Sequence, residues 1–85
     1  MGDDMYEKIY VAVTVKIDEN GDIRPLAIIW EDGAVYEIDR VRYKINAASL
    51  KGGGRGVRYT VVIEGKERYL FDEDGRWFVE RKALK

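Results

Sequence analysis

The chain has no cysteine and no histidine among its 85 residues. The absence of cysteine excludes disulfide bonds, thiolate metal ligands and a cysteine nucleophile. The absence of histidine removes the most common general base and the most common side-chain ligand for metals. The only serine, Ser49, therefore has no histidine to activate it. We expect a protein that is not an enzyme, with no catalytic residue, no metal site and no cofactor.

Long apolar runs are also missing, and none approaches the roughly 18 residues that a membrane-spanning helix needs. The opening segment MGDDMYEKIY is acidic and lacks the apolar core of a signal peptide. We therefore expect a cytoplasmic protein with no membrane partner. The length predicts one domain over residues 1–85, in which residues 1–6 form a loose N-terminus.

Acidic side chains are entirely absent from residues 40–63, although the whole chain carries a net charge of −1. This basic segment holds six cations, whereas residues 1–39 carry three bases and ten acids. Residues 64–85 carry six charges of each sign. A segment of one sign within an acidic protein needs either neighbouring carboxylates or an anionic partner.

Alternation of apolar and polar residues dominates what is present, and this period of two predicts β-strands. Short turns rich in Gly, Asn and Asp separate the alternating segments, and they are predicted at Asn20-Gly21, residues 31–33, Glu64-Gly65 and residues 72–75. Asn20-Gly21 is typical of a tight hairpin. The predicted strands cover residues 8–17, 23–30, 34–46, 56–63, 66–71 and 76–81. We expect an all-β meander of about six antiparallel strands that forms a small barrel or roll, because closure removes open edges. The small core also makes a homodimer that shares a sheet edge a reasonable expectation.

Two irregularities interrupt this alternation. Pro25 lies within a predicted strand, which predicts an edge position or a β-bulge because proline has no N–H to donate. In the third strand the apolar residues change parity, from Tyr36 and Ile38 to Val41, Tyr43 and Ile45. A β-bulge near residues 39–40 would return both sets to the core.

The glycine-rich segment ASLKGGGRGVRY, residues 48–59, does not match a nucleotide-binding motif. A P-loop needs Gly-Lys followed by Ser or Thr, but Glu67 follows Gly65-Lys66. A dinucleotide fingerprint needs a different glycine spacing and a following helix, whereas a strand is predicted here. We interpret the segment as a flexible connector between two strands, with Lys51 and Arg55 at its tip.

Acidic turns do not form a convincing calcium site either. The segment DENGD places Asp18, Asn20 and Asp22 at alternate positions, as in a calcium-binding loop. Ile23 and Ile29 then occupy the positions that require glycine and a bidentate glutamate. A hairpin turn explains the segment better, and we assign no metal to it.

The basic segment has a regular geometry in an extended conformation. Arg40, Arg42 and Lys44 alternate with Val41, Tyr43 and Ile45, so the cations are predicted to point outward and the apolar residues inward. Arg58 has the same outward parity on the next strand. The candidate anion-binding or nucleic-acid-binding residues are therefore Arg40, Arg42, Lys44, Lys51, Arg55 and Arg58. The alternative is neutralisation by acids on neighbouring strands, such as Glu37, Glu64 or Glu67.

Four segments together resemble a group of short, uncharacterised bacterial all-β proteins built from a domain of unknown function. These segments are PLAIIWEDGAVYEIDRV, ASLKGGGRGVRY, YTVVIEGKERYLF and EDGRWFVE, within residues 23–81. The resemblance is carried by Trp30, Gly33, Tyr36, Tyr69, Gly75 and Trp77. It implies a small bacterial all-β protein and little else, because the group has no assigned activity, cofactor or catalytic residue.

These observations predict a non-catalytic binding or interaction module. The ten aromatic residues can fill a small core or form a binding surface for bases or a peptide. One hypothesis is binding of RNA or single-stranded DNA through the basic region over residues 40–58. The other is a protein partner, or a second copy, that uses an open strand edge and exposed aromatic residues.

Overall fold

The computed structural model describes residues 6–46 and 56–82, which form eight strands and no helix. The strands are β1 (Tyr6–Tyr10), β2 (Ala12–Ile17), β3 (Ile23–Ile29), β4 (Val35–Glu37), β5 (Arg40–Asn46), β6 (Val57–Ile63), β7 (Lys66–Glu73) and β8 (Arg76–Lys82). The predicted all-β class is therefore confirmed for these residues. Of the loose N-terminus predicted over residues 1–6, residues 1–5 lie outside the described residues, whereas Tyr6 begins β1 and pairs with Lys82. The connector carrying Lys51 and Arg55 also lies outside the described residues.

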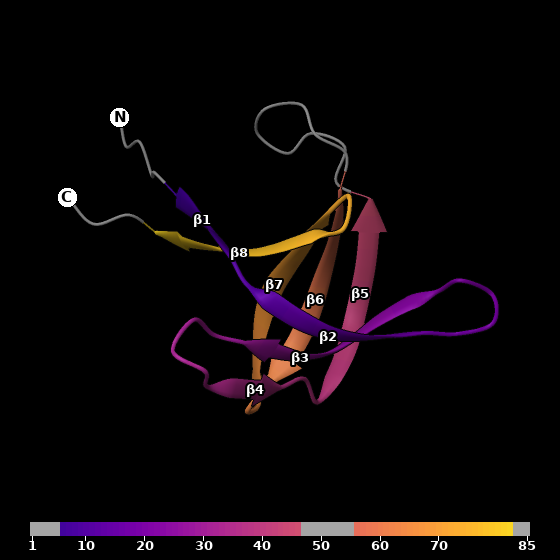
Figure 1. Ribbon diagram of the computed structural model, residues 1–85, viewed down its shortest axis with the longest axis horizontal. Coiled ribbons are helices and arrows are strands. Elements are labelled where there is room, and N and C mark those ends of the chain that lie inside the picture. The colour runs from indigo at the N-terminus through magenta and orange to yellow at the C-terminus, as the bar shows by residue number, and fades with distance from the viewer. Residues whose placement is uncertain (1–5, 47–55, 83–85) are drawn as a thin grey trace.

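The strands form two antiparallel sheets rather than one meander. Sheet A has five strands in the order β1-β8-β7-β6-β5, and sheet B has three in the order β2-β3-β4. Figure 1 shows β2, β3 and β4 running across β5, β6 and β7. The arrangement is an open roll, because within the described residues each sheet keeps two edge strands and no barrel closes. No helix in this part of the chain is long and apolar enough to cross a membrane.

The first predicted strand, residues 8–17, divides between the two sheets at Val11. Its N-terminal part is β1, which pairs with β8, and its C-terminal part is β2, which pairs with β3. The Val11 N–H donates to the Trp77 carbonyl at 3.0 Å, so the crossing residue still belongs to the hydrogen-bond ladder of sheet A. The apolar alternation runs through the crossing unchanged, which is why the sequence predicted one strand.

The third predicted strand, residues 34–46, also divides, and the bulge predicted near residues 39–40 is wrong. The Ile38 N–H donates to the Leu26 carbonyl of sheet B, and the next N–H, of Asp39, donates to the Val62 carbonyl of sheet A. The parity change therefore marks a crossing between sheets. A register shift does occur further along, between Val41 and Tyr43.

The bulge alternative for Pro25 is confirmed. The pairing of β2 with β3 shifts between Thr14 and Val15, where Val15 lies opposite Pro25. On the other side of β3, β4 pairs only with residues 27–29, so no ladder partner requires an N–H from the buried proline.

The main core lies between the two sheets. Ile28 of sheet B packs with Tyr59, Val61 and Leu70 of sheet A, and all four side chains are buried. The Tyr59 ring lies 5.3 Å from the Trp77 ring, centroid to centroid. This packing identifies the face of sheet A that carries Tyr59 as its inner face, and the opposite face as its outer face.

Candidate nucleic-acid interface

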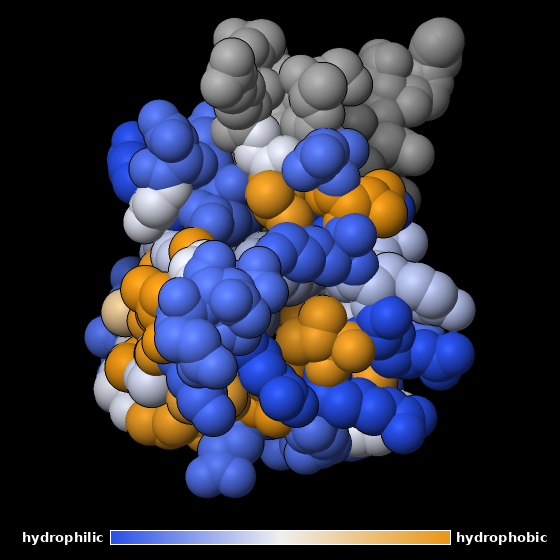
Figure 2. Space-filling view, turned by 90° about the vertical axis from the view of Figure 1, so that its right-hand side faces the viewer, coloured by the Kyte–Doolittle hydropathy of each residue, from blue (hydrophilic) through white to orange (hydrophobic). Residues whose placement is uncertain are grey.

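The outer face of sheet A is defined by the strand register, because directly opposed residues in an antiparallel pair project to the same side. Across four strands, Tyr10 lies opposite Phe78, Phe78 opposite Phe71, and Phe71 opposite Arg58. The described outer face comprises Lys8, Tyr10, Arg40, Arg42, Tyr43, Ile45, Arg58, Thr60, Val62, Glu67, Tyr69, Phe71, Glu73, Arg76, Phe78 and Glu80. Figure 2 views sheet A from its β5 edge, with the turn between β2 and β3 also toward the viewer, and shows hydrophobic patches separated by hydrophilic side chains on that side.

An aromatic cluster forms the centre of this face. The Phe71 and Phe78 rings stack at 4.8 Å with an interplanar angle of 4°, and the edge of Tyr10 meets Phe78 at 5.6 Å. Phe78 has no exposed surface. This aromatic cluster lies on the face turned away from sheet B. Sheet A therefore carries buried apolar side chains on both of its faces.

Four cations lie against aromatic rings of this face. The distances from the cation to the ring centroid are 4.7 Å for Lys8 over Phe78, 5.5 Å for Arg42 over Tyr43, 4.4 Å for Arg58 over Tyr69 and 3.9 Å for Arg76 over Tyr10. The three tyrosines remain about half exposed, at 43% for Tyr10, 57% for Tyr43 and 53% for Tyr69. The face therefore presents flat π surfaces and positive charge together.

Carboxylates neutralise only some of these cations. Lys8 pairs with Glu73 at 3.2 Å, and Arg42 reaches across β6 to pair with Glu67 at 3.1 Å. Neutralisation by Glu67, one of the predicted acids, is thus confirmed for Arg42. Among the described residues, no carboxylate lies within ion-pair distance of Arg40, Arg58 or Arg76. The Nε of Arg58 is buried and has no hydrogen-bond partner there.

The six predicted candidates do not all come together. Arg40, Arg42 and Arg58 lie on the outer face, but Lys44 lies opposite Tyr59 on the inner face, with its Nζ 5.6 Å from that ring. The cause is the register shift between Val41 and Tyr43, which reverses the parity of the rest of β5. Tyr43 and Ile45 are consequently exposed, so their predicted inward position is wrong. Lys51 and Arg55 lie outside the described residues.

Two cations of this face, Lys8 and Arg76, were missed by the sequence prediction. They come from β1 and β8, which are far from the basic segment in sequence and join the face only because β8 pairs with both β1 and β7. Their alternation with Tyr10 and Phe78 was visible in the sequence. The pairing that brings them beside Arg58 was not.

Glu73 is the acid that holds the β1 end of this face together. Its carboxylate accepts hydrogen bonds from the Tyr10 hydroxyl at 2.8 Å and from Lys8 Nζ at 3.2 Å. These two hydrogen bonds, from Tyr10 first and then Lys8, lower the pKa of Glu73 below its ordinary value. Both bonds favour the charged form of the carboxyl group.

This lowered pKa predicts a specific acid sensitivity. A carboxyl group with a lower pKa in the folded state contributes stability above its ordinary pKa of 4.5, and loses it as the pH falls through the folded pKa. Glu73→Gln should therefore flatten the acid side of the profile of unfolding free energy against pH. Tyr10→Phe should flatten it in the same direction, and the double variant should add little. Urea unfolding at a series of acid pH values measures the profile. The prediction is contradicted if the unfolding free energies of the wild type and of Glu73→Gln fall equally steeply as the pH is lowered.

Acidic side chains are spread over this part of the chain rather than gathered into a metal site. The described residues contain no group of three or more acids that could hold a metal ion. The outer face combines aromatic surface with positive charge.

Comparison with known proteins found no matching family model, no matching curated protein and no matching solved structure. The resemblance to short bacterial all-β proteins therefore remains a prediction.

Proposed function

We propose that the protein is a non-catalytic binding module that holds single-stranded nucleic acid on the outer face of sheet A. The observation that carries the proposal is the set of cation–aromatic pairs, in which three half-exposed tyrosines each lie beside an arginine. Bases of single strands stack on aromatic rings and on guanidinium planes. A face of this kind can accept bases without reading one particular sequence.

The distribution of charge supports an anionic ligand at this face despite the net charge of −1. The outer face carries five cations and three acids among its described residues. The acids of residues 18–39 lie on sheet B and its turns, or on the crossing to β5, and so lie outside this face. Arg40, Arg58 and Arg76 form no ion pair among the described residues, although Arg76 lies opposite Glu73, and these three cations are available to phosphates.

Salt dependence of binding tests the proposal directly. A labelled oligouridylate and a labelled oligothymidylate should bind in fluorescence anisotropy at low salt, and the affinity should fall steeply as salt rises. Arg58→Gln and Arg76→Gln should each reduce the slope of log K against log salt by about 0.7, the value for one lost contact to a single strand. Arg24→Gln, an exposed arginine of β3 in sheet B, is the matched control and should leave the slope unchanged.

The contribution of base stacking to the binding affinity is tested with a separate variant. Tyr69→Ala should weaken binding by about 1–3 kcal/mol with little change in the salt slope, because it removes a ring and no charge. Tyr36→Ala in sheet B, where the side chain is exposed to a similar extent, is the control. No binding at low salt, or equal losses in Tyr69→Ala and Tyr36→Ala, would overturn the proposal. A protein partner for the same tyrosines would show a shallow salt dependence instead.

A further inference from the structure

Sheet A opens between two of its interior strands. β7 pairs with β8 only through Phe71–Phe78, Asp72–Trp77 and Glu73–Arg76. Beyond these three pairs, residues 79–82 of β8 pair with β1 alone, and residues 66–70 of β7 pair with β6 alone. Figure 1 shows β8 turning away from the direction of β7. In the described part of the chain, one side of residues 66–70 therefore has no strand beside it, and we call this side the β7 edge.

The main-chain groups that point into the opening follow from the hairpin geometry. Asp74 and Gly75, with φ values of 55° and 96°, form a two-residue turn closed by the Glu73–Arg76 pair. Along an antiparallel strand, the main-chain N–H and C=O groups of alternate residues point to the same side. The groups of Glu73 point toward β8, so those of Phe71, Tyr69 and Glu67 point to that side as well. Tyr69 and Glu67 consequently present N–H and C=O groups to the opening with no strand to receive them. Unpaired groups of this kind are a template for another extended chain.

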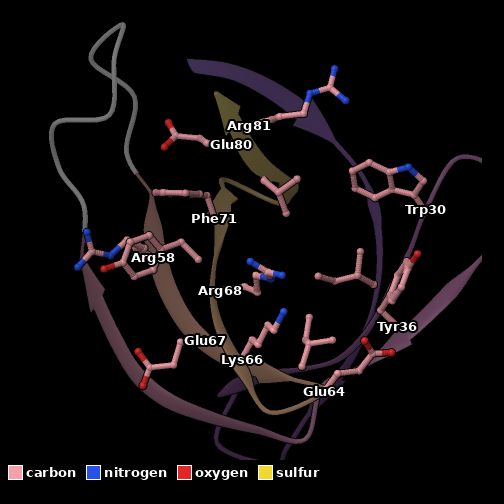
Figure 3. Close-up of a pocket in the computed structure, with 14 residues that line it drawn as sticks. Trp30, Tyr36, Arg58, Glu64, Lys66, Glu67, Arg68, Phe71, Glu80 and Arg81 are labelled. Atoms are coloured by element: carbon pink, nitrogen blue, oxygen red, sulfur yellow. The ribbon is translucent and has the colours of Figure 1, made fainter. Parts of the chain in front are cut away.

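A pocket of about 870 Å³ lies along the β7 edge. Ile28, Trp30, Ile63 and Val79 contribute apolar surface to it. In Figure 3, Lys66 and Arg68 project from β7 into the centre of the pocket, and Trp30 and Tyr36 of sheet B face them from the opposite wall. The opening is therefore a groove with apolar and aromatic surface below an unpaired strand edge.

The charges of the groove distinguish the kind of chain that fits it. Lys66 and Arg68 have no ion-pair partner among the described residues, whereas Arg81 is paired with Glu7. Glu80 and Glu64 also line the pocket, and Figure 3 places them above and below the two cations. On the inner face, the side chains beside a new strand would be Lys66, Arg68 and Leu70, which are two cations and one apolar residue. On the outer face they would be Glu67 and Tyr69.

We propose that the β7 edge binds an acidic peptide segment of another protein as an additional antiparallel strand. Hydrogen bonds to Tyr69 and Glu67 would hold the backbone, and acidic side chains would lie opposite Arg68 and Lys66. A second copy of this chain fits less well. Antiparallel pairing of two β7 edges through Glu67 and Tyr69 would set the two copies of Arg68 opposite each other. Arg58 and Tyr69 also line the pocket, so this site borders the outer face. It uses the main chain of β7 and the inner-face cations Lys66 and Arg68 rather than the tyrosine rings, so either proposal can fail alone.

The register of the added strand determines the sequence of the test peptide. The peptide acetyl-Val-Thr-Glu-Thr-Glu-amide places valine opposite Leu70 and its two glutamates opposite Arg68 and Lys66. Titration into the ¹⁵N-labelled protein should shift the backbone amide signals of Glu67 and Tyr69 and slow their hydrogen exchange. Arg68→Gln and Lys66→Gln should each weaken binding about two- to fivefold, the range for one cross-strand charge pair. Arg24→Gln on β3 is the matched control and should have no effect.

Two modified peptides separate strand addition from simple charge attraction. N-methylation of the first threonine, which faces Tyr69, removes a hydrogen bond to β7 and should abolish binding. N-methylation of the first glutamate, whose N–H points away from β7, should be tolerated better, and the peptide with lysines for glutamates should bind more weakly. The proposal is overturned by an absence of shifts at Glu67 and Tyr69 up to about 1 mM peptide, the weak end of measurable affinity. Equal binding of the two N-methylated peptides would also overturn it.

Discussion

Phe78→Ala is expected to lower the free energy of unfolding by about 3–5 kcal/mol, the usual cost of removing a fully buried phenylalanine. Phe78 has no exposed surface, stacks on Phe71 at 4.8 Å and receives the edge of Tyr10 and the ammonium group of Lys8. Its removal would leave a cavity beneath the outer face and take a partner from three neighbours. Since small domains have a total stability of only about 5–15 kcal/mol, a large part of the population could unfold.

Urea unfolding followed by tryptophan fluorescence measures this loss. Tyr36→Ala in sheet B, an exposed aromatic residue, is the control and should cost about 1 kcal/mol or less. A double-mutant cycle with Phe71→Ala should give a coupling energy of about 0.5–1.5 kcal/mol, as stacked aromatic pairs do. A cost for Phe78→Ala no greater than that of Tyr36→Ala would show that the aromatic cluster does not stabilise sheet A.

Leu70→Ala is expected to cost about 2–5 kcal/mol, because it empties the centre of the core between the two sheets. Leu70 is fully buried in the cluster with Ile28, Tyr59 and Val61. Leu26→Ala is a close control, since it makes the same chemical change at a β3 position that is 40% exposed. Thermal and urea unfolding of the two variants should differ by at least about 1 kcal/mol, and equal losses would contradict the packing of sheet B on sheet A.

Local patterns in the sequence predicted most of the strands and turns. Alternation placed six extended segments, and the predicted turns at Asn20-Gly21, residues 31–33, Glu64-Gly65 and residues 72–75 all join antiparallel neighbours. In two of these turns Glu64 and Asp74 adopt positive φ angles together with the glycine that follows. Such signals lie within a few residues of one another, so a single sequence contains them.

The division into two sheets could not be predicted in the same way. Val11 continues the apolar parity of its neighbours while the chain leaves sheet A for sheet B, so alternation carries no sign of the crossing. The parity change at residues 38–39 was visible, but a bulge and a crossing produce the same local pattern. Only the hydrogen bonds of Ile38 and Asp39 to different sheets distinguish the two.

The candidate site was predicted in part for a similar reason. Arg40, Arg42 and Arg58 share a face as expected, because their strands are neighbours. The register shift before Tyr43 moved Lys44 to the other face, and no residue type in VRY signals a bulge. The cation–aromatic pairs of β1 and β8 depend on a pairing between segments that are far apart in the chain.

The pairing of β1 with β8 also sets the order in which the strands can pair during synthesis. β1 is synthesised first of the described strands, but its partner β8 is synthesised last. During translation the β6–β7 and β7–β8 hairpins can form from local contacts, whereas β1 must remain without its ladder until β8 has left the ribosome. Completion of sheet A at its β1 side is therefore a late event, and the Tyr10 and Lys8 contacts with Phe78 and Glu73 should appear only in its final step.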